Sequence, residues 1–262
     1  MVAAVSSRLI LGMLILMAWS HDLSAQIGES DADDYFEFLT RANHYSPLEH
    51  AGSHGTLGVG IGAGMASYET PAGDLVMQEH WRQTGASVAS NQRDSSRVNM
   101  GQIHVSKGLP YSLDVGGGFA RDSRSNAEFV SGYVQWTGYE AFAMPALALR
   151  GQYSRLMGLA TTDASAVEAS VVVSYGFLRL FTVYGNYGVG RHDMVVRVGP
   201  AFGTSLALAG ESDGTVGRVL IRQSRSLGMQ YQLLPPFCIV AAEYSQVGHG
   251  SGSYLAKVSV GM

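Results

Sequence analysis

Apolar and polar residues alternate along most of the chain with a period of two, most clearly near its end. In the final ten residues, Val258 and Val260 fall on one face of an extended strand, whereas Lys257 and Ser259 fall on the other. Successive side chains of a β-strand point to opposite faces, so this segment predicts a strand with one apolar and one polar face. Together with residues 237–246 it predicts an antiparallel hairpin.

The same alternation recurs in eight earlier segments, which we also predict to be strands. They are residues 56–68, 98–107, 111–120, 130–137, 147–154, 167–175, 181–187 and 227–233. The region 191–223 has two interpretations, because it fits either two further strands, at 195–208 and 215–222, or one long loop. The count is therefore about 12 strands with this pair and about 10 without it, and both numbers are even.

The start of the chain has the features of an export signal. Arg8 precedes the apolar run Leu9 to Trp19, and small residues end the segment at Ala25. The apolar run is only about half of the roughly 20 residues that a membrane-spanning helix needs. We therefore predict a secretory signal peptide at residues 1–25, removed after Ala25.

Two patterns favour a membrane-spanning barrel over a soluble β-sandwich, whose strands also alternate. If the tight turns share one rim, the outward-facing aromatic residues fall into two groups, as expected at the two water boundaries of a bilayer. The predicted girdle residues are Tyr111, Trp136 and Tyr175 beside the turns, and Phe119, Tyr153, Tyr187, Tyr244 and Tyr254 near the polar loops. Ionisable strand residues occupy the opposite face, where a barrel lumen tolerates charge. The predicted lumen-lining residues are Asp114, Arg150, Glu168, Arg218, Arg222, Glu243 and Lys257.

With the signal, the alternation and a strand at its end, the chain resembles the outer-membrane β-barrel proteins of Gram-negative bacteria. The resemblance implies an all-β, antiparallel, up-and-down transmembrane β-barrel at residues 55–262, located in the cell outer membrane. It also implies folding by the barrel-assembly machinery, which recognises the last strand. Proteins of this class usually end in an aromatic residue, whereas this chain ends in Met262.

Residues 26–54 form a separate N-terminal segment. Three aspartates precede Tyr35 and Phe36, which predicts a short helix with acidic residues in its first turn. Ser46-Pro47 then ends helical structure. We interpret the segment either as a periplasmic tail or as a plug inside the barrel.

Candidate catalytic residues are few. His249-Gly250-Ser251 resembles the His-x-Ser motif of outer-membrane lipid A deacylases, in which the histidine is the base and the serine the nucleophile. That resemblance implies an acidic residue after the serine, but no Asp or Glu follows Glu243. We therefore expect no enzyme activity and retain His249 and Ser251 as weak catalytic candidates.

His44, His50 and His54 cluster before the first predicted strand. On a helix His50 and His54 would share one face and could bind a metal ion, but Gly52 and Gly55 argue against a helix there. We expect polar surface histidines, with no metal site and no cofactor.

Composition narrows the remaining choices. The net charge of −4 gives no sign of nucleic-acid binding, and the single Cys238 excludes an intrachain disulfide. Because a wide aqueous channel takes about 16 strands, we expect a plugged or narrow lumen. The predicted protein is a monomer in contact with outer-membrane lipids, either a structural surface protein or a narrow passage for small solutes. The alternatives are a lipid-modifying hydrolase and a soluble secreted β-sandwich.

The first prediction concerns cell fractionation. A membrane barrel should be recovered in outer membranes, and after detergent extraction it should migrate differently on a gel before and after boiling. Recovery in the soluble fraction would instead require the apolar face to be covered by protein, as in a sandwich.

Overall fold

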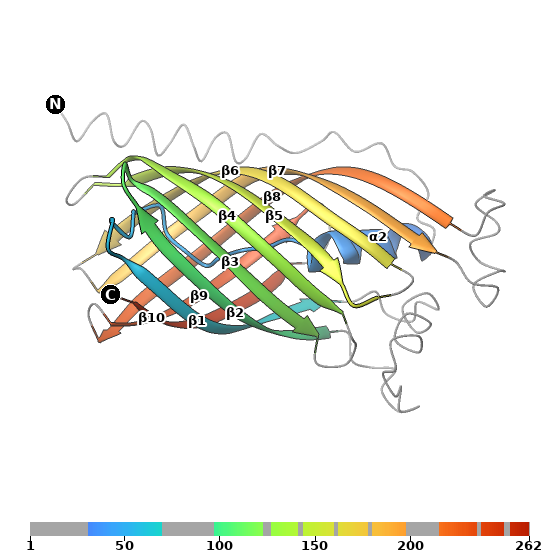
Figure 1. Cartoon of the computed structure of the whole chain (residues 1–262), viewed down its shortest axis with the longest axis horizontal. Helices are drawn as coiled ribbons and strands as arrows, with labels where there is room; N and C mark the ends of the chain where they lie inside the picture. Colours follow the sequence, from blue (N-terminus) through green and yellow to red (C-terminus); the bar gives the residue numbers. More distant parts are fainter. Residues whose placement is uncertain are drawn as a thin grey trace. The chain divides into compact units, whose positions relative to one another are not determined.

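Ten antiparallel strands form one closed barrel in the computed structural model (Figure 1). The structure describes residues 31–69, 97–122, 127–140, 144–159, 162–177, 180–197, 215–234, 237–248 and 252–261. Each strand pairs with its neighbours in the chain, and β1 pairs with β10 to close the ring. A soluble β-sandwich, which needs two packed sheets, is therefore wrong.

The elements follow one another as a helix and then ten strands. Their bounds are α2 (Asp31–Ala42), β1 (Val59–Glu69), β2 (Arg97–Leu109), β3 (Leu113–Asp122), β4 (Glu128–Tyr139), β5 (Ala146–Met157), β6 (Thr162–Phe177), β7 (Phe181–Arg197), β8 (Thr215–Leu234), β9 (Cys238–Val247) and β10 (Ser253–Gly261). The helix predicted with the three aspartates in its first turn is α2. In the described part of the chain, no helix is long and apolar enough to cross a membrane.

The prediction of about 12 strands is wrong, and the alternative of 10 is confirmed. Residues 195–197 are the end of β7, and residues 215–222 are the first part of the 20-residue strand β8. The exposed polar side chains of Gln223 and Arg225 interrupt the apolar face of β8, which made one long strand read as two. Residues 198–214 lie outside the described part of the chain, as does the predicted signal peptide.

The turn between β2 and β3 also differs from the prediction. Tyr111 was predicted to begin a strand, but β3 begins at Leu113. Tyr111 and Ser112 have φ angles of 66° and 58°, in the left-handed region, so they form the turn itself. The Tyr111 side chain projects from this rim and is 90% exposed.

The two faces of the wall differ sharply in polarity. Large apolar side chains such as Ile61, Val134 and Val258 point outward and are about half exposed. The inward residues beside the last two, Gln135 and Lys257, are almost completely buried. This is the alternation that the sequence predicts, with the apolar face on the outside of the barrel.

Glycines on the inner face make room for large side chains in the lumen. A Cβ atom at Gly116 would meet the ring of Tyr133 and lie 2.8 Å from the carbonyl oxygen of Val105. A Cβ atom at Gly118 would lie 2.9 Å from the ring of Tyr45. The interior is therefore filled, and wall and contents fit closely.

Replacing one inward glycine tests this close fit. Gly116→Ala should lower the free energy of unfolding by about 1–3 kcal/mol, because the new methyl group collides with Tyr133 and a carbonyl group. Gly151→Ala is the matched control, since a Cβ atom there meets nothing within 4 Å, and it should stay within about 0.5 kcal/mol of the native protein. Reversible denaturant unfolding measures both, and equal effects would contradict a filled lumen.

Candidate functional site in the barrel lumen

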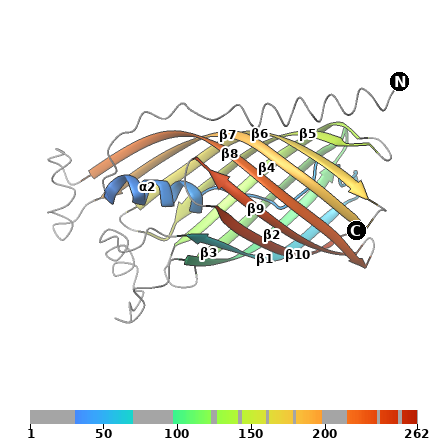
Figure 2. The ribbon, with the colours of Figure 1, turned by 180° about the vertical axis from the view of Figure 1, so that it is seen from behind.

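Residues 31–54, which we call the plug, run through the barrel lumen from one rim to the other. The α2 helix lies at the barrel end away from residue 261, as both views show (Figures 1 and 2). There the Tyr35 hydroxyl lies 3.3 Å from the Thr162 hydroxyl, at the start of β6. The chain then descends to the opposite rim, where the His54 amide donates to Asp114 at 3.1 Å, near the start of β3. β1 begins five residues later, at this same rim.

The half of the plug nearest the α2 rim, which we call the upper half, is apolar. Tyr35, Phe36, Phe38 and Leu39 of α2 are buried. They pack in one cluster with inward-facing wall residues, namely Tyr68, Val98, Met100, Phe129, Leu156, Ala164, Met194, Val196 and Leu255. Burial of each large apolar side chain contributes about 1.5–3 kcal/mol, so the four from α2 contribute on the order of 6–12 kcal/mol before entropic costs. The helix is thus a packed part of the fold.

The lower half of the plug, residues 43–54, is polar. Side chains of the barrel strands, which form the wall, bind its main chain. Side chains from several strands donate hydrogen bonds to successive carbonyl groups of the extended segment. The pairs are Lys257 to Pro47 at 2.6 Å, Gln230 to Leu48 at 2.8 Å, Arg150 to Glu49 at 2.8 Å, Gln135 to His50 at 3.0 Å and Thr137 to Ala51 at 2.7 Å. An extended segment has no partners of its own for these groups, so the wall supplies them.

The Glu49 carboxylate is the centre of the polar contacts. It accepts hydrogen bonds from the Tyr133 hydroxyl and from His104 Nε2 at 2.8 Å, and Lys257 Nζ lies 3.4 Å away. These three contacts join one plug residue to β2, β4 and β10.

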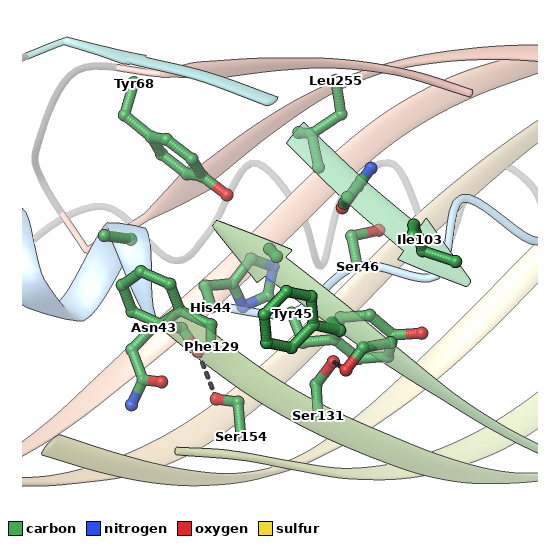
Figure 3. Close-up of a pocket in the computed structure, with 15 residues that line it drawn as sticks. Asn43, His44, Tyr45, Ser46, Tyr68, Ile103, Phe129, Ser131, Ser154 and Leu255 are labelled. Atoms are coloured by element: carbon green, nitrogen blue, oxygen red, sulfur yellow. Dashed lines mark hydrogen bonds between the residues drawn. The ribbon is translucent and has the colours of Figure 1, made fainter. Parts of the chain in front are cut away.

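Two further carboxylates of the wall bind side chains of the plug. His44 Nδ1 lies 2.9 Å from Glu168, and the Ser46 hydroxyl donates to Glu243 at 2.7 Å. Figure 3 shows this region, in which the Ser154 hydroxyl also donates to the carbonyl oxygen of Asn43. The cavity enclosed there measures only about 20 Å³, which is room for one water molecule and excludes a larger ligand.

The predicted lumen-lining residues divide into three groups. Five are almost completely buried against the plug, namely Asp114, Arg150, Glu168, Glu243 and Lys257. Arg222 Nε donates to Glu37 of α2 at 2.9 Å. Arg218 belongs to the stretch of β8 that pairs with β7 but not with β9, so it projects beyond the closed wall and is exposed.

The predicted surface position of the histidines is wrong. His44 is buried beside Glu168, and His54 contacts Asp114, because residues 43–54 lie inside the barrel. Among the residues that the structure describes, no group of three or more His, Cys, Asp or Glu could hold a metal ion.

The remaining candidates are on the outer face or outside the described residues. The strand residues of the predicted girdle lie on the outward-facing side, and they are Phe119, Trp136, Tyr153, Tyr175, Tyr187, Tyr244 and Tyr254. Residues 249–251, which include the weak catalytic candidates His249 and Ser251, and residue 262 lie outside the described part of the chain.

The sequence analysis missed the residues that hold the plug. His104, Tyr133, Gln135 and Gln230 lie on the inward face of strands whose alternation is visible in the sequence, so their orientation could have been predicted. Glu49 gave no such signal, because it lies in a segment without periodicity.

Similar proteins were found by structure and not by sequence. No protein-family model matches the chain, and no curated protein sequence matches it. The solved structures that it resembles include outer-membrane β-barrel proteins and a designed transmembrane β-barrel. The chain has the same fold class, a closed antiparallel barrel.

Three of these structures illustrate the level of similarity. The attachment invasion locus protein Ail of Yersinia pestis is 11% identical with a TM-score of 0.32, covering 78% of this chain and 97% of Ail. The N-terminal β-barrel domain of Pseudomonas aeruginosa OprF is 10% identical with a TM-score of 0.34, covering 79% and 97%. The KdgM porin is 7% identical with a TM-score of 0.37, covering 76% and 98%. Likeness at this level says nothing about function.

Removing the Glu49 carboxylate tests its central role. Glu49→Ala leaves Lys257 buried without its anion, and breaking a buried pair in this way should cost about 3–5 kcal/mol of unfolding free energy. Glu49→Gln can still accept hydrogen bonds and should lose less.

The matched control is Glu128→Ala, which removes a partly exposed carboxylate 3.7 Å from the exposed guanidinium of Arg121. Exposed pairs contribute about 0–1 kcal/mol, so this variant should behave nearly as the native protein does. Denaturant unfolding in detergent micelles compares the three, and an equal effect of Glu49→Ala and Glu128→Ala would refute the assignment.

Proposed function

We propose that the protein is an integral outer-membrane β-barrel that is closed by its own N-terminal segment and serves as a surface or structural protein. The observation that carries the proposal is the path of residues 35–54, which fill the lumen from rim to rim. We further expect a monomer that contacts outer-membrane lipids and is folded by the barrel-assembly machinery.

The outer face supports a lipid environment. Its apolar band is continuous around the wall and far exceeds the patches that soluble monomers expose. Exposed aromatic residues lie at both ends of the band, with Trp136 and Phe237 near the tight turns and Tyr153 and Tyr254 near the other rim. Such rings are typical of the two boundaries of a bilayer.

Outward-facing arginines limit the band at the rim that holds α2. Arg121 and Arg155 follow Phe119 and Tyr153 by two residues on the same outward faces, and both are exposed. A charge near the bilayer midplane costs a few kcal/mol but little at the interface, so these positions mark the headgroup level.

A passage for solutes is the second candidate, and the lumen argues against it. Opening a path past α2 would expose an apolar cluster worth on the order of 6–12 kcal/mol, in addition to the hydrogen bonds made by residues 43–54. Thermal fluctuation does not supply that energy, so solutes would need an external agent to displace the plug. The hydrolase alternative rests on His249 and Ser251 alone.

Single-channel recording in planar bilayers tests closure. The native protein should show no sustained conductance in concentrated potassium chloride, because residues 35–54 fill the lumen from one rim to the other. The double variant Phe36→Ser/Leu39→Ser weakens the apolar seal and should produce frequent openings. Val134→Ser, which alters only the outer face, is the control and should remain closed. Steady conductance by the native protein would overturn the proposal and favour the passage.

A further inference from the structure

The two ends of the described chain, Asp31 and Gly261, lie at opposite rims of the barrel. Gly261 of β10 pairs with Gly60 of β1, so both lie at the rim where the plug ends. Asp31, the first residue of α2, belongs to the opposite rim, because Tyr35 contacts the start of β6 and Glu37 contacts the upper part of β8. The chain therefore crosses the whole barrel before its first strand begins.

The two rims differ in the length of their connections. At the rim of Gly261 all four connections are short, and they span residues 110–112, 140–145, 178–180 and 235–237. At the rim of α2 three connections are also short, at residues 123–127, 158–161 and 248–252, but the two long ones, 70–96 and 198–214, are both there. Outer-membrane barrels place short turns in the periplasm and longer connections outside. By this rule the α2 rim is the external one.

The contacts of the plug fix its direction. Reversing it would place Tyr35, Phe36 and Leu39 against Asp114, Arg150 and Lys257, and would bury those charges without partners. It would also leave the apolar cluster of the upper wall facing polar residues. Both changes are costly, so one orientation of the segment is strongly preferred.

We propose that this barrel presents the N-terminal end of α2 at the cell surface: Asp31 lies at the external rim of the long connections, and the chain that follows it crosses the lumen to the periplasmic rim. The inference rests on the proposed membrane location. The barrel then acts as a support for the sequence placed before its helix, and a peptide fused there would be displayed outside.

Site-directed cysteine labelling on intact cells tests the proposal. The native Cys238 is first replaced by serine, and single cysteines are introduced as Ser30→Cys, Ser205→Cys and Ser112→Cys. Position 30 precedes α2, position 205 belongs to a long connection, and position 112 lies in the tight turn between β2 and β3. The probe is a membrane-impermeant maleimide, applied before and after permeabilisation of the outer membrane.

The expected result is labelling of the cysteines at positions 30 and 205 on intact cells, with position 112 labelled only after permeabilisation. Protection of position 30 together with position 112, while position 205 is labelled, would overturn the proposal. Labelling of position 112 alone on intact cells would overturn it too, because the barrel would then be inserted the other way. Recovery of the protein in the soluble fraction would instead refute the membrane location itself.

A crosslinking test keeps the inference falsifiable if the label at position 30 is hindered. Thr40 Oγ1 lies 3.8 Å from Met194 Sδ, so cysteines at these two positions should be joined by a short bismaleimide crosslinker when the plug is threaded as described. Leu48→Cys/Met194→Cys is the matched control, because Leu48 lies in the polar half, where its carbonyl group accepts a hydrogen bond from Gln230. A crosslink in the control and none in the Thr40 pair would overturn the assigned direction.

Discussion

The requirement that a closed wall be filled governs this structure. Pairing of β1 with β10 closes the ring and leaves the barrel without a free first or last strand, but it also encloses inward-facing residues that need partners. On the upper wall several of these residues are apolar, including Val98, Met100 and Leu156, and water is a poor partner for them. The apolar face of α2 covers them. The helix and the upper wall are therefore two halves of one hydrophobic core.

The polar half of the lumen is stabilised by paired charges and hydrogen bonds. Charges removed from water are tolerated only when they are paired and hydrogen-bonded, and the plug supplies what the wall lacks. Glu49 neutralises Lys257, while wall side chains bind the carbonyl groups of residues 47–51. Because the wall binds main-chain groups, the conformation of the segment matters more there than most of its side chains. Glu49 is the exception, since its carboxylate faces β2, β4 and β10 at once.

Much of the wall could be predicted from sequence, because strand alternation has a period of two and leaves little choice of face. Arg150 and Lys257 were assigned to the interior on that basis alone, and α2 was expected from its acidic start. The division of β8 failed because polar residues on its outer face broke the apolar pattern. Residues 43–54 were beyond prediction, since side chains from distant strands set their conformation. One signal was available: Val98, Met100 and Leu156 place apolar residues on a face where a water-filled lumen would have polar ones.

Threading has a consequence for the order of assembly. The first and last strands of the chain form the seam of the ring, and the plug joins directly to the first of them. A segment that crosses a closed ring cannot enter from the side, so the plug must be in place before the seam closes or be drawn through afterwards as an unfolded strand. Contacts between the two ends of a chain form slowly, which leaves time for the first route. The pairing of β1 with β10 then makes release of the plug slow, because the plug leaves the lumen only if α2 unfolds or β1 separates from β10.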